Sequence, residues 1–268
     1  MNQKLTKYAW LLPFFSGICW GAAGIFVRTL EHDGLDNFSI ISFRMLLAAL
    51  ITGIWILVFY NISVTKGSLA LSAVLLAMSP VFVLFLAAVF FHEPVTRHKL
   101  TCVTLAFIGC VLVSGVLESN GLSWSITGIL CGILASFFYA VYGIISKKVT
   151  QKGYHFLTIT FYGTLFSGMT MLPFSNIHSL SSMIVSGQMT TFFILIIHAL
   201  VSSVLPYALY SLSMRYMEAG KASILASSEP AAAMLFGAVL YAETPGILSI
   251  CGLCFTITAV ILLNYERN

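Results

Sequence analysis

Long apolar stretches follow one another along almost the whole chain. Each has about twenty residues, which is enough for a helix to cross the roughly 30 Å hydrocarbon core of a bilayer. Hydrophobic residues make up 59% of the chain and charged residues only 8%, whereas about a quarter of residues are charged in soluble proteins. The sequence therefore predicts a protein that lies in a membrane. Nine candidate spans can be drawn, at residues 8–29, 38–60, 68–91, 99–117, 125–146, 156–174, 190–214, 219–241 and 246–264.

These spans are expected to be helices. Runs such as 40–60 and 70–91 are apolar throughout, whereas membrane-spanning strands alternate polar and apolar residues. A helix also pairs its backbone polar groups within one segment, as lipid requires. The first span follows Lys4 and Lys7 as the core of a secretory signal would, but it is longer than a typical signal core and no convincing small-residue cleavage site follows it. We interpret it as a retained helix, and the fold class as an all-α polytopic membrane protein.

Part of the chain occurs twice. Residues 66–113 align with 216–263 at an offset of 150, and residues 17–43 align with 136–162 at an offset of 119. Because 150 − 119 = 31, the first copy is about 31 residues shorter than the second, which corresponds to one span and its loop. The sequence therefore predicts two repeats, with four spans in residues 1–118 and five in residues 119–268, against an expected total of ten.

Loop charges favour a plan of ten crossings, because Lys and Arg accumulate on the cytoplasmic side. With ten crossings and a cytoplasmic N-terminus, only Arg28 and Arg44 lie at the outer face. The other basic residues are then cytoplasmic: Lys4, Lys7, Lys66, Arg97, Lys99, Lys147, Lys148, Lys152, Arg215, Lys221 and Arg267. Nine crossings fit less well. A cytoplasmic N-terminus then places most of these residues outside, and an outer N-terminus places Lys4 and Lys7 on the outer side.

A unit of five crossings also makes the second repeat enter the membrane from the opposite side, which gives inverted repeats. The first repeat has only four recognisable spans, and residues 61–67 are too few and too polar to supply a fifth.

Short motifs in both repeats carry a resemblance to a known family. They are Cys19-Trp20-Gly21-Ala22, then Met78-Ser79-Pro80-Val81-Phe82 leading to His92-Glu93-Pro94, and Ser228-Glu229-Pro230-Ala231 leading to Ala242-Glu243-Thr244. In order and spacing the chain resembles the EamA family of the drug/metabolite transporter superfamily over nearly its whole length. The resemblance implies a ten-helix carrier of the bacterial-type inner (cell) membrane with two inverted repeats. Such a carrier moves small metabolites, often outward. The chain departs from this pattern where the family's third helix is expected.

Glu229 is the most informative candidate site residue. It lies ten residues into the 219–241 span, close to the bilayer midplane, where an ionised side chain is costly. Pro230 removes a backbone donor and frees a carbonyl one turn earlier, as in the broken helices of carriers. The repeat partners Ser79 and Pro80 keep the break without the charge. One hypothesis is that Glu229 faces the substrate path and binds a cationic group or exchanges a proton; the alternative is a protonated glutamate bonded to a neighbouring helix.

Small residues form stripes on two spans. Gly17, Gly21 and Gly24 recur at helical spacing on the first span. Their repeat partners Ser136, Ala140 and Gly143 continue a similar stripe that begins with Gly128 and Gly132. Small residues let membrane helices approach closely, so we expect both stripes to be helix contacts.

Aromatic and polar residues near the stripes are further candidates for the substrate or ion path. Trp20, its repeat partner Tyr139 and nearby Tyr142 line a central cavity in one interpretation and face lipid or neighbouring helices in the other. His198 is a candidate proton-relay partner of Glu229, with simple packing as the alternative. Ser227 either binds substrate or bonds to the carbonyl one turn earlier. The complete set is Glu229, Trp20, Tyr139, Tyr142, Ser79, Ser227, His198 and Tyr207, with helix breaks expected at Pro80, Pro206 and Pro230.

Other functional classes lack support. The chain has no HExxH or GxSxG motif, and the CxxC spacing of Cys251 and Cys254 has no histidine partner nearby, so we interpret these cysteines as small residues at a helix contact. The net charge of +4 is spread over loops, which is typical of orientation signals and not of nucleic-acid binding. We expect no catalytic, metal or cofactor site. The expected partners are the lipid bilayer, a small-molecule solute and, if transport is coupled, a proton.

Two alternatives stay open for a chain that is one helix short. The chain is a transport-incompetent truncated carrier or structural remnant if the gap opens the wall of the substrate site. A homodimer would instead let a neighbouring copy fill the gap.

Overall fold

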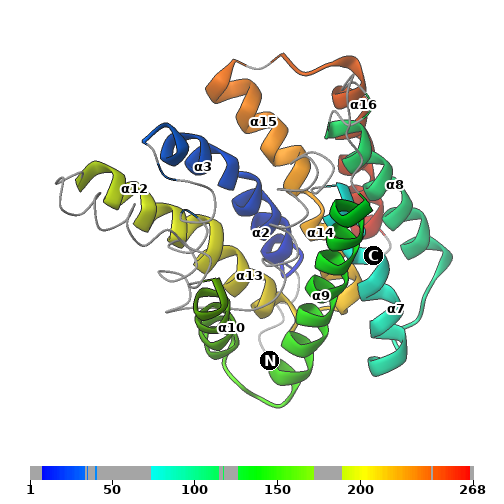
Figure 1. The fold of residues 1–268 in the computed structure, drawn as a ribbon. Coiled ribbons are helices and arrows are strands. Elements are labelled where there is room, and N and C mark those ends of the chain that lie inside the picture. The colour runs from blue at the N-terminus through cyan, green and yellow to red at the C-terminus, as the bar shows by residue number, and fades with distance from the viewer. Residues whose placement is uncertain are drawn as a thin grey trace.

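The regular structure in the described part of the chain is helical (Figure 1). The computed structural model describes residues 8–33, 35, 40, 74–114, 117, 126–171, 189–242 and 244–265. The elements are α2 (Leu11–Gly21), α3 (Ala23–His32), α7 (Ser79–Phe91), α8 (Arg97–Val113), α9 (Ile126–Gln151), α10 (Phe156–Met171), α12 (Met189–Ala199), η2 (Leu200–Val204), α13 (Leu205–Ser213), α14 (Ala219–Ala226), α15 (Glu229–Tyr241) and α16 (Ile247–Tyr265).

Six helical segments in these ranges are long and apolar enough to cross a membrane: Leu11–His32, Val74–Phe91, Ile126–Gln151, Met189–Ser213, Ala219–Tyr241 and Ile247–Tyr265. The protein is an all-α polytopic membrane protein, as its sequence predicts. The predicted span 99–117 corresponds to α8, which ends at Val113, and the predicted span 156–174 corresponds to α10, which is described as far as Met171. The predicted span 38–60 and the gap at 61–70 lie outside the described residues, apart from Ile40.

Three of the long segments are interrupted next to a proline. Turns at 77–78 and 227–228 precede α7 and α15, and Pro80 and Pro230 occupy the first turns of these helices. Such a proline leaves no bond unmade within its own helix, because the donor it lacks would have bonded to a carbonyl oxygen before the break. Pro206 occupies the first turn of α13, directly after the π-helical turn η2.

Corresponding elements of the two halves follow the offset of 150. α7 and α15 each have 13 residues and end at a residue with left-handed backbone, His92 (φ 55°) and Ala242 (φ 52°). α8 and α16 begin at Arg97 and Ile247. α7 packs against α9, whereas α15 packs against α2. Each half therefore places its proline-broken helix on the first helix of the other half. The boundary at 118/119 falls outside the described residues and stays a prediction.

α8 and α16 pack along each other at backbone distance. A Cβ added to Gly109 would lie 2.8 Å from the Gly252 carbonyl oxygen, and one added to Gly252 would lie 2.7 Å from the Gly109 carbonyl oxygen. Two glycines at the crossing thus let the helices touch through their backbones.

The bundle has one basic end. Glu93 pairs with Lys147, and Lys99 pairs with Glu218, so residues 92–99, 147–155 and 214–221 lie together there. Trp10 shares a hydrophobic cluster with Met217 and Leu263, so α2 begins and α16 ends at the same end. The basic residues gathered there are Arg97, Lys99, Lys147, Lys148, Lys152, Arg215 and Lys221.

The opposite end of the bundle is called the far end. It contains the described residues that flank the segment 36–73 in the sequence, namely those around Leu35 and Val74. Leu30 and Leu35 pack with Leu195, near the start of the Met189–Ser213 segment, and Val74 packs with Ile129 near the start of α9. The number of crossings between these two points depends on residues outside the described ranges and stays a prediction.

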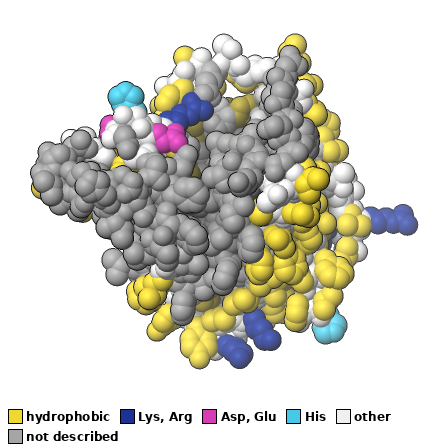
Figure 2. Space-filling view, viewed as in Figure 1, with side chains coloured by type: hydrophobic (Ala, Val, Ile, Leu, Met, Phe, Trp, Pro, Cys, Tyr) yellow, Lys and Arg dark blue, Asp and Glu magenta, His cyan; other side chains and the backbone are white. Residues whose placement is uncertain are grey.

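Apolar side chains cover much of the described surface. Figure 2 shows them along the lower and right-hand parts of one face, with Lys and Arg near the margins. Large exposed examples are Phe85, Val89, Val239, Ile257 and Ile261. Such a surface is unfavourable in water and suits contact with lipid chains.

Candidate transport site

The glycine stripe of α2 lies against the break between α14 and α15. A Cβ on Gly17 would lie 2.6 Å from the Ala226 carbonyl oxygen, and one on Gly21 would lie 2.6 Å from the Glu229 carbonyl oxygen. Ser228 Oγ also donates a hydrogen bond to the Phe14 carbonyl oxygen at 3.1 Å. The break is therefore held directly on α2. Around Gly24, by contrast, the described residues leave open space, since an added Cβ would have no atom within 4 Å.

Glu229 is the first residue of α15, next to this break, and it is half-buried. The positive end of the helix dipole favours an ionised carboxylate at that position. The Glu229 carbonyl oxygen faces Gly21, the neighbour of Trp20 in the chain. The residue therefore sits where α15 of the second half meets α2 of the first half.

Ser79 and Ser227 are both buried at their helix breaks. Ser79 is the first residue of α7 and corresponds to Glu229 by the offset of 150. Ser227 Oγ donates to the Ser223 carbonyl oxygen at 3.3 Å. In this structure the Ser227 hydroxyl therefore bonds to the backbone one turn earlier, which is the packing alternative considered from the sequence.

Four of the aromatic candidates gather beside the break. The Trp20 ring centroid lies 5.6 Å from that of Tyr139 and 5.1 Å from that of Tyr207. Tyr142 contacts Tyr207 at 5.5 Å, and its hydroxyl is 3.0 Å from Ser211 Oγ. Tyr210, which is fully buried, completes the group. The rings meet mostly edge to face or tilted, which is a favourable arrangement for aromatic pairs, and they join α2, α9 and α13.

His198 packs on a different neighbour. Its ring stacks on Phe26 of α3 with centroids 5.1 Å apart, and Nδ1 lies 3.2 Å from Ser202 Oγ in η2. His198 is fully buried. These contacts tie α12 and η2 to α3, and the relay with Glu229 stays a hypothesis. The remaining glycines Gly128, Gly132 and Gly143 lie on the buried side of α9, and a Cβ on Gly143 would lie 3.1 Å from the Tyr210 hydroxyl.

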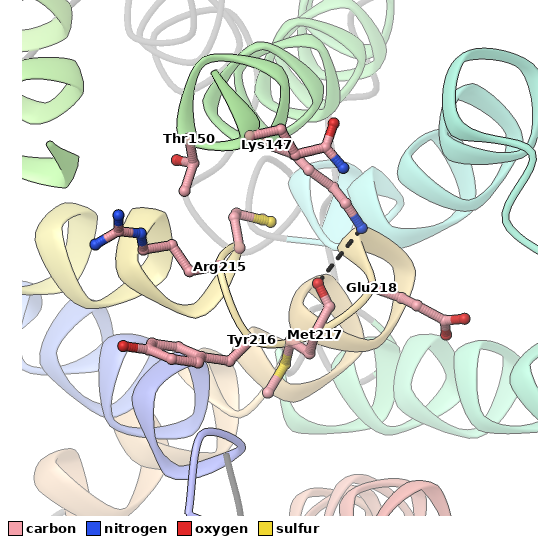
Figure 3. Close-up of a pocket in the computed structure, with 8 residues that line it drawn as sticks. Lys147, Thr150, Arg215, Tyr216, Met217 and Glu218 are labelled. Carbon is pink, nitrogen blue, oxygen red and sulfur yellow. Dashed lines mark hydrogen bonds between the residues drawn. The ribbon is translucent and has the colours of Figure 1, made fainter. Parts of the chain in front are cut away.

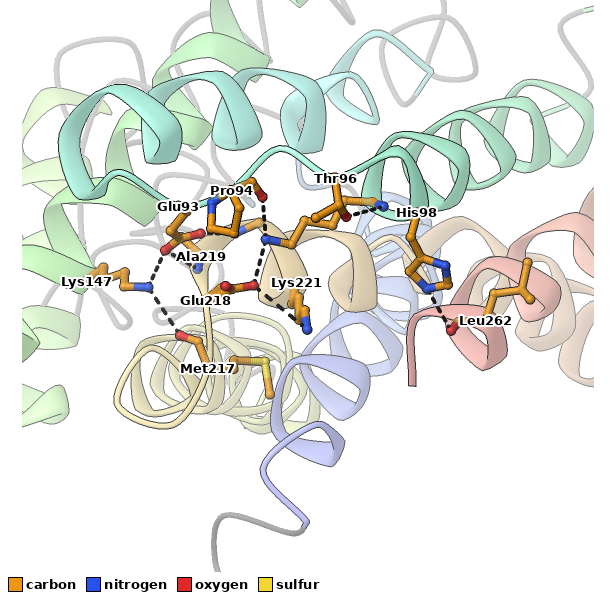
Figure 4. Close-up of polar contacts among 12 residues, drawn as sticks. Glu93, Pro94, Thr96, His98, Lys147, Met217, Glu218, Ala219, Lys221 and Leu262 are labelled. Carbon is orange, nitrogen blue, oxygen red and sulfur yellow. Dashed lines mark hydrogen bonds and ion pairs between the residues drawn. The ribbon is translucent and has the colours of Figure 1, made fainter. Parts of the chain in front are cut away.

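A network of ion pairs closes the basic end (Figure 4). The Glu93 carboxylate pairs with Lys147 Nζ and accepts hydrogen bonds from the backbone amides of Ala219 at 3.0 Å and Gly220 at 3.4 Å. Lys147 Nζ also donates to the Met217 carbonyl oxygen at 3.4 Å. Glu93 is 9% exposed and Lys147 is 7% exposed, so this pair is largely removed from water.

A second pair lies beside the first. Lys99 Nζ is 2.7 Å from Glu218 Oε2 and donates to the Pro94 carbonyl oxygen at 2.8 Å. Lys99 is fully buried, whereas Glu218 is partly exposed. Both ion pairs join residues from the first half to residues from the second.

An open pocket of about 420 Å³ lies at the basic end (Figure 3). It is lined by Lys147, Thr150, Gln151 and the run 214–218. Thr150, which lines this pocket, and Ser146, Tyr210 and Ser223 have buried hydroxyls with no hydrogen-bond partner among the described residues. Tyr210 and Ser223 face each other without reaching hydrogen-bond geometry. In the described residues, three or more His, Cys, Asp and Glu side chains do not gather in a way that could hold a metal ion.

The family of the chain follows from comparison with known proteins. The EamA-like transporter family matches residues 52–115 and 126–265. The chain belongs to this family. It is a multi-pass membrane transporter by family.

Named relatives agree with membership of the EamA-like family. The chain is 24% identical to the uncharacterized transporter YxxF of Bacillus subtilis (strain 168), covering 100% of this chain and 93% of the relative. It is 25% identical to an uncharacterized transporter of Archaeoglobus fulgidus, covering 97% of both chains. A solved crystal structure matches with a TM-score of 0.77 at 10% identity and covers 96% of both chains. This last likeness shows a shared fold.

In this EamA-like transporter, sequence reasoning and structure agree only in part about which residues lie together. The structure brings Trp20, Tyr139, Tyr142 and Tyr207 into one cluster and places Glu229 near it. It places His198 against α3. In the sequence, Glu93 was identified only within a family motif, and the buried partners of this residue were not predicted. The available signal was charge: oppositely charged residues end several spans at one face.

Proposed function

We propose that this EamA-like transporter exports small metabolites, such as amino acids or amines, across a bacterial-type inner membrane by alternating access. One observation carries the proposal: the only glutamate inside a predicted span interior, Glu229, starts a broken helix that contacts the other half of the bundle. Carriers built from inverted repeats place their substrate sites at such breaks, near the midplane and between the repeats. The aromatic cluster beside the break supplies ring faces that attract cationic groups.

Proton coupling is part of this proposal. An ionised carboxylate near the bilayer midplane is unfavourable unless a bound cation or a proton compensates its charge. In the proposed cycle, Glu229 releases its proton when a cationic amine group binds and regains a proton after the amine leaves. Because the amine and the proton bind the same carboxylate in turn, one proton enters for each solute that leaves.

Reconstitution in vesicles tests the proposal. Export of a panel of amino acids and amines is measured with and without an imposed pH gradient. For a transported solute, Glu229→Gln is expected to lower the rate by about tenfold or more, equivalent to about 1.4 kcal/mol, and to remove the response to the gradient. Glu31→Gln changes an exposed residue of α3 and serves as the matched control. Full, pH-dependent transport by Glu229→Gln would exclude the role of this carboxylate.

A second candidate is a truncated carrier that does not transport, because the sequence predicts a first repeat that is one span short. The alignment with the Bacillus subtilis relative runs over 300 positions, whereas this chain has 268 residues, a difference of 32. This difference is close to the 31 residues by which the first repeat is shorter than the second. In the vesicle assay, export of none of the amino acids and amines in the panel would favour the truncated, transport-incompetent form.

A further inference from the structure

Both buried ion pairs at the basic end join the two halves of the bundle. Glu93 follows α7 of the first half, whereas Lys147 lies on α9 of the second half and Ala219 begins α14. Lys99 of α8 pairs with Glu218 in the same way. Rocking of one repeat against the other is the usual motion of inverted-repeat carriers. Such a motion cannot open the basic end unless these contacts break.

The free energy of a buried ion pair allows the Glu93–Lys147 contact to break and form again. A buried ion pair loses the hydration of both charges, and this loss offsets much of the attraction between them. When the end opens, water rehydrates both side chains and compensates for the broken pair. The closed and open forms can therefore have similar free energies, which allows a solute to shift the balance between them.

The far end carries a related arrangement. Lys147 Nζ lies 5.3 Å from the ring centroid of Phe91, and the Arg28 guanidinium lies 4.6 Å from the ring centroid of Tyr241. These residues correspond by the repeat offsets, since 147 − 119 = 28 and 91 + 150 = 241. Each end thus places a cation from one half over an aromatic ring that ends the broken helix of the other half. Lys147 is buried and Arg28 is exposed, so the basic end is the more tightly closed of the two.

The side chains behind the basic end suit a polar solute. The Tyr210 hydroxyl approaches Gly143 on α9, and Ser146 and Thr150 follow on the same face of that helix. With Ser223 of α14, these are four of the six buried hydroxyls that lack partners among the described residues; the other two are those of Thr160 and Ser203. A buried hydroxyl without a hydrogen bond is unfavourable. Water or a hydrogen-bonding solute would satisfy these groups once the end opens.

We propose that the Glu93–Lys147 ion pair is the lock that closes the basic end of a hydroxyl-lined solute route, and that Arg28 is its counterpart at the far end. This inference rests on the proposed alternating access. It adds the residues that hold each end shut and the side chains along the inner half of the route.

Cysteine accessibility tests the lock without knowledge of the substrate. Ser146→Cys is introduced into the full chain in vesicles of known orientation, and a membrane-impermeant maleimide is added from the side of the basic end. The chain without this cysteine gives the background from the native cysteines. Adding Glu93→Gln is expected to raise the labelling rate of the Ser146→Cys chain by about tenfold or more. The reason is that Lys147 then lacks its counter-ion, which destabilises the closed form. Lys148→Met changes the exposed neighbouring cation and is expected to leave the rate unchanged.

Arg28→Met separates a lock from general loosening. It weakens the far end, so it is expected to shift the protein toward the form with a closed basic end and to return the Glu93→Gln rate toward that of the Ser146→Cys chain. An equal rise in labelling with Arg28→Met, or no rise with Glu93→Gln, would overturn the proposal. If Glu93→Gln does not fold, an oxidised Glu93→Cys/Lys147→Cys pair replaces it; labelling that persists when this disulfide is formed would likewise overturn the lock. Labelling that responds as expected in a chain that transports nothing would keep the lock and reject the proposed transport function.

Discussion

At the scale of single residues, close helix contact decides which glycines matter. Gly17, Gly21 and Gly24 look equivalent in the sequence because all three follow one helical stripe. The structure separates them, since Gly17 and Gly21 meet the backbone of the α14–α15 break and Gly24 faces open space among the described residues. The stripe predicted where helices approach, but only the position of the partner helix shows how far along the stripe the contact extends.

This difference gives a prediction for stability. Gly17→Ala and Gly21→Ala each place a methyl group about 2.6 Å from a carbonyl oxygen of the broken helix, so each is expected to destabilise the protein by about 1–3 kcal/mol. Gly24→Ala is the matched control and is expected to be neutral or stabilising by up to about 1 kcal/mol, because alanine favours helix. Thermal unfolding in detergent measures the three variants. Equal losses at all three positions would contradict this account of the contact.

The buried charges show the limit of sequence reasoning at this scale. Glu93, Lys99 and Lys147 each end or begin a predicted span, and a charge at that position is typical of the membrane interface. Their burial results from contacts between segments 54 to about 120 residues apart in the chain. Spacing along one segment does not contain that information. The aromatic cluster was easier to anticipate, because Trp20 and Tyr139 are repeat partners.

At the scale of elements, the helix breaks link sequence to mechanism. Apolar run length predicted most described helices to within a few residues, and proline marked the places where three of them are interrupted. The π-helical turn at Leu200–Val204 was not predicted, since no periodicity in an apolar run distinguishes it from an α-helix. At the α14–α15 break, Pro230 lacks the N–H that would bond to the Ala226 carbonyl oxygen, and this oxygen points instead toward Gly17.

Restoring that donor is expected to separate stability from activity. In Pro230→Ala the new N–H can bond to the Ala226 carbonyl oxygen and continue the helix through the break, so the unfolding temperature is expected to stay unchanged or to rise. Transport of an identified solute is expected to fall several-fold, because the break no longer positions Glu229. Pro245→Ala, in an exposed segment before α16, should alter neither property. Undiminished transport by Pro230→Ala would show that the break is not needed.

At the scale of the whole molecule, the sequence predicts a first half that is too short for five crossings. Residues 34–73 number forty and join the described bundle at the far end on both sides. Two helical crossings use about forty residues and leave none for the loop between them. The sequence predicted this shortage from its two repeat offsets, and loop charges predicted that the N-terminus lies at the basic end. How the gap is filled depends on contacts outside a single chain's sequence pattern.

A homodimer that fills the gap makes a specific prediction. A single cysteine introduced as Asn61→Cys, in a chain without the native cysteines, is expected to crosslink to a second copy in the membrane and to give a band of twice the mass. Lys152→Cys, at the basic end after α9, is the control and is expected to give no such band. Absence of any dimer from Asn61→Cys, in lipid and at several protein concentrations, would count against a shared wall.

The backbone contact between α8 and α16 has a mechanical consequence. Gly109 lies twelve residues from the start of α8 at the basic end but only four residues from its other terminus, which corresponds to lever arms of about 18 Å and 6 Å. A tilt of about 10° around this pivot would move the basic end by about 3 Å and the far end by about 1 Å. The longer arm ends at the ion pairs. Hydrogen bonds and ion pairs do not survive a displacement of about 3 Å. A small tilt of α8 about Gly109 is therefore enough to separate the ion pairs.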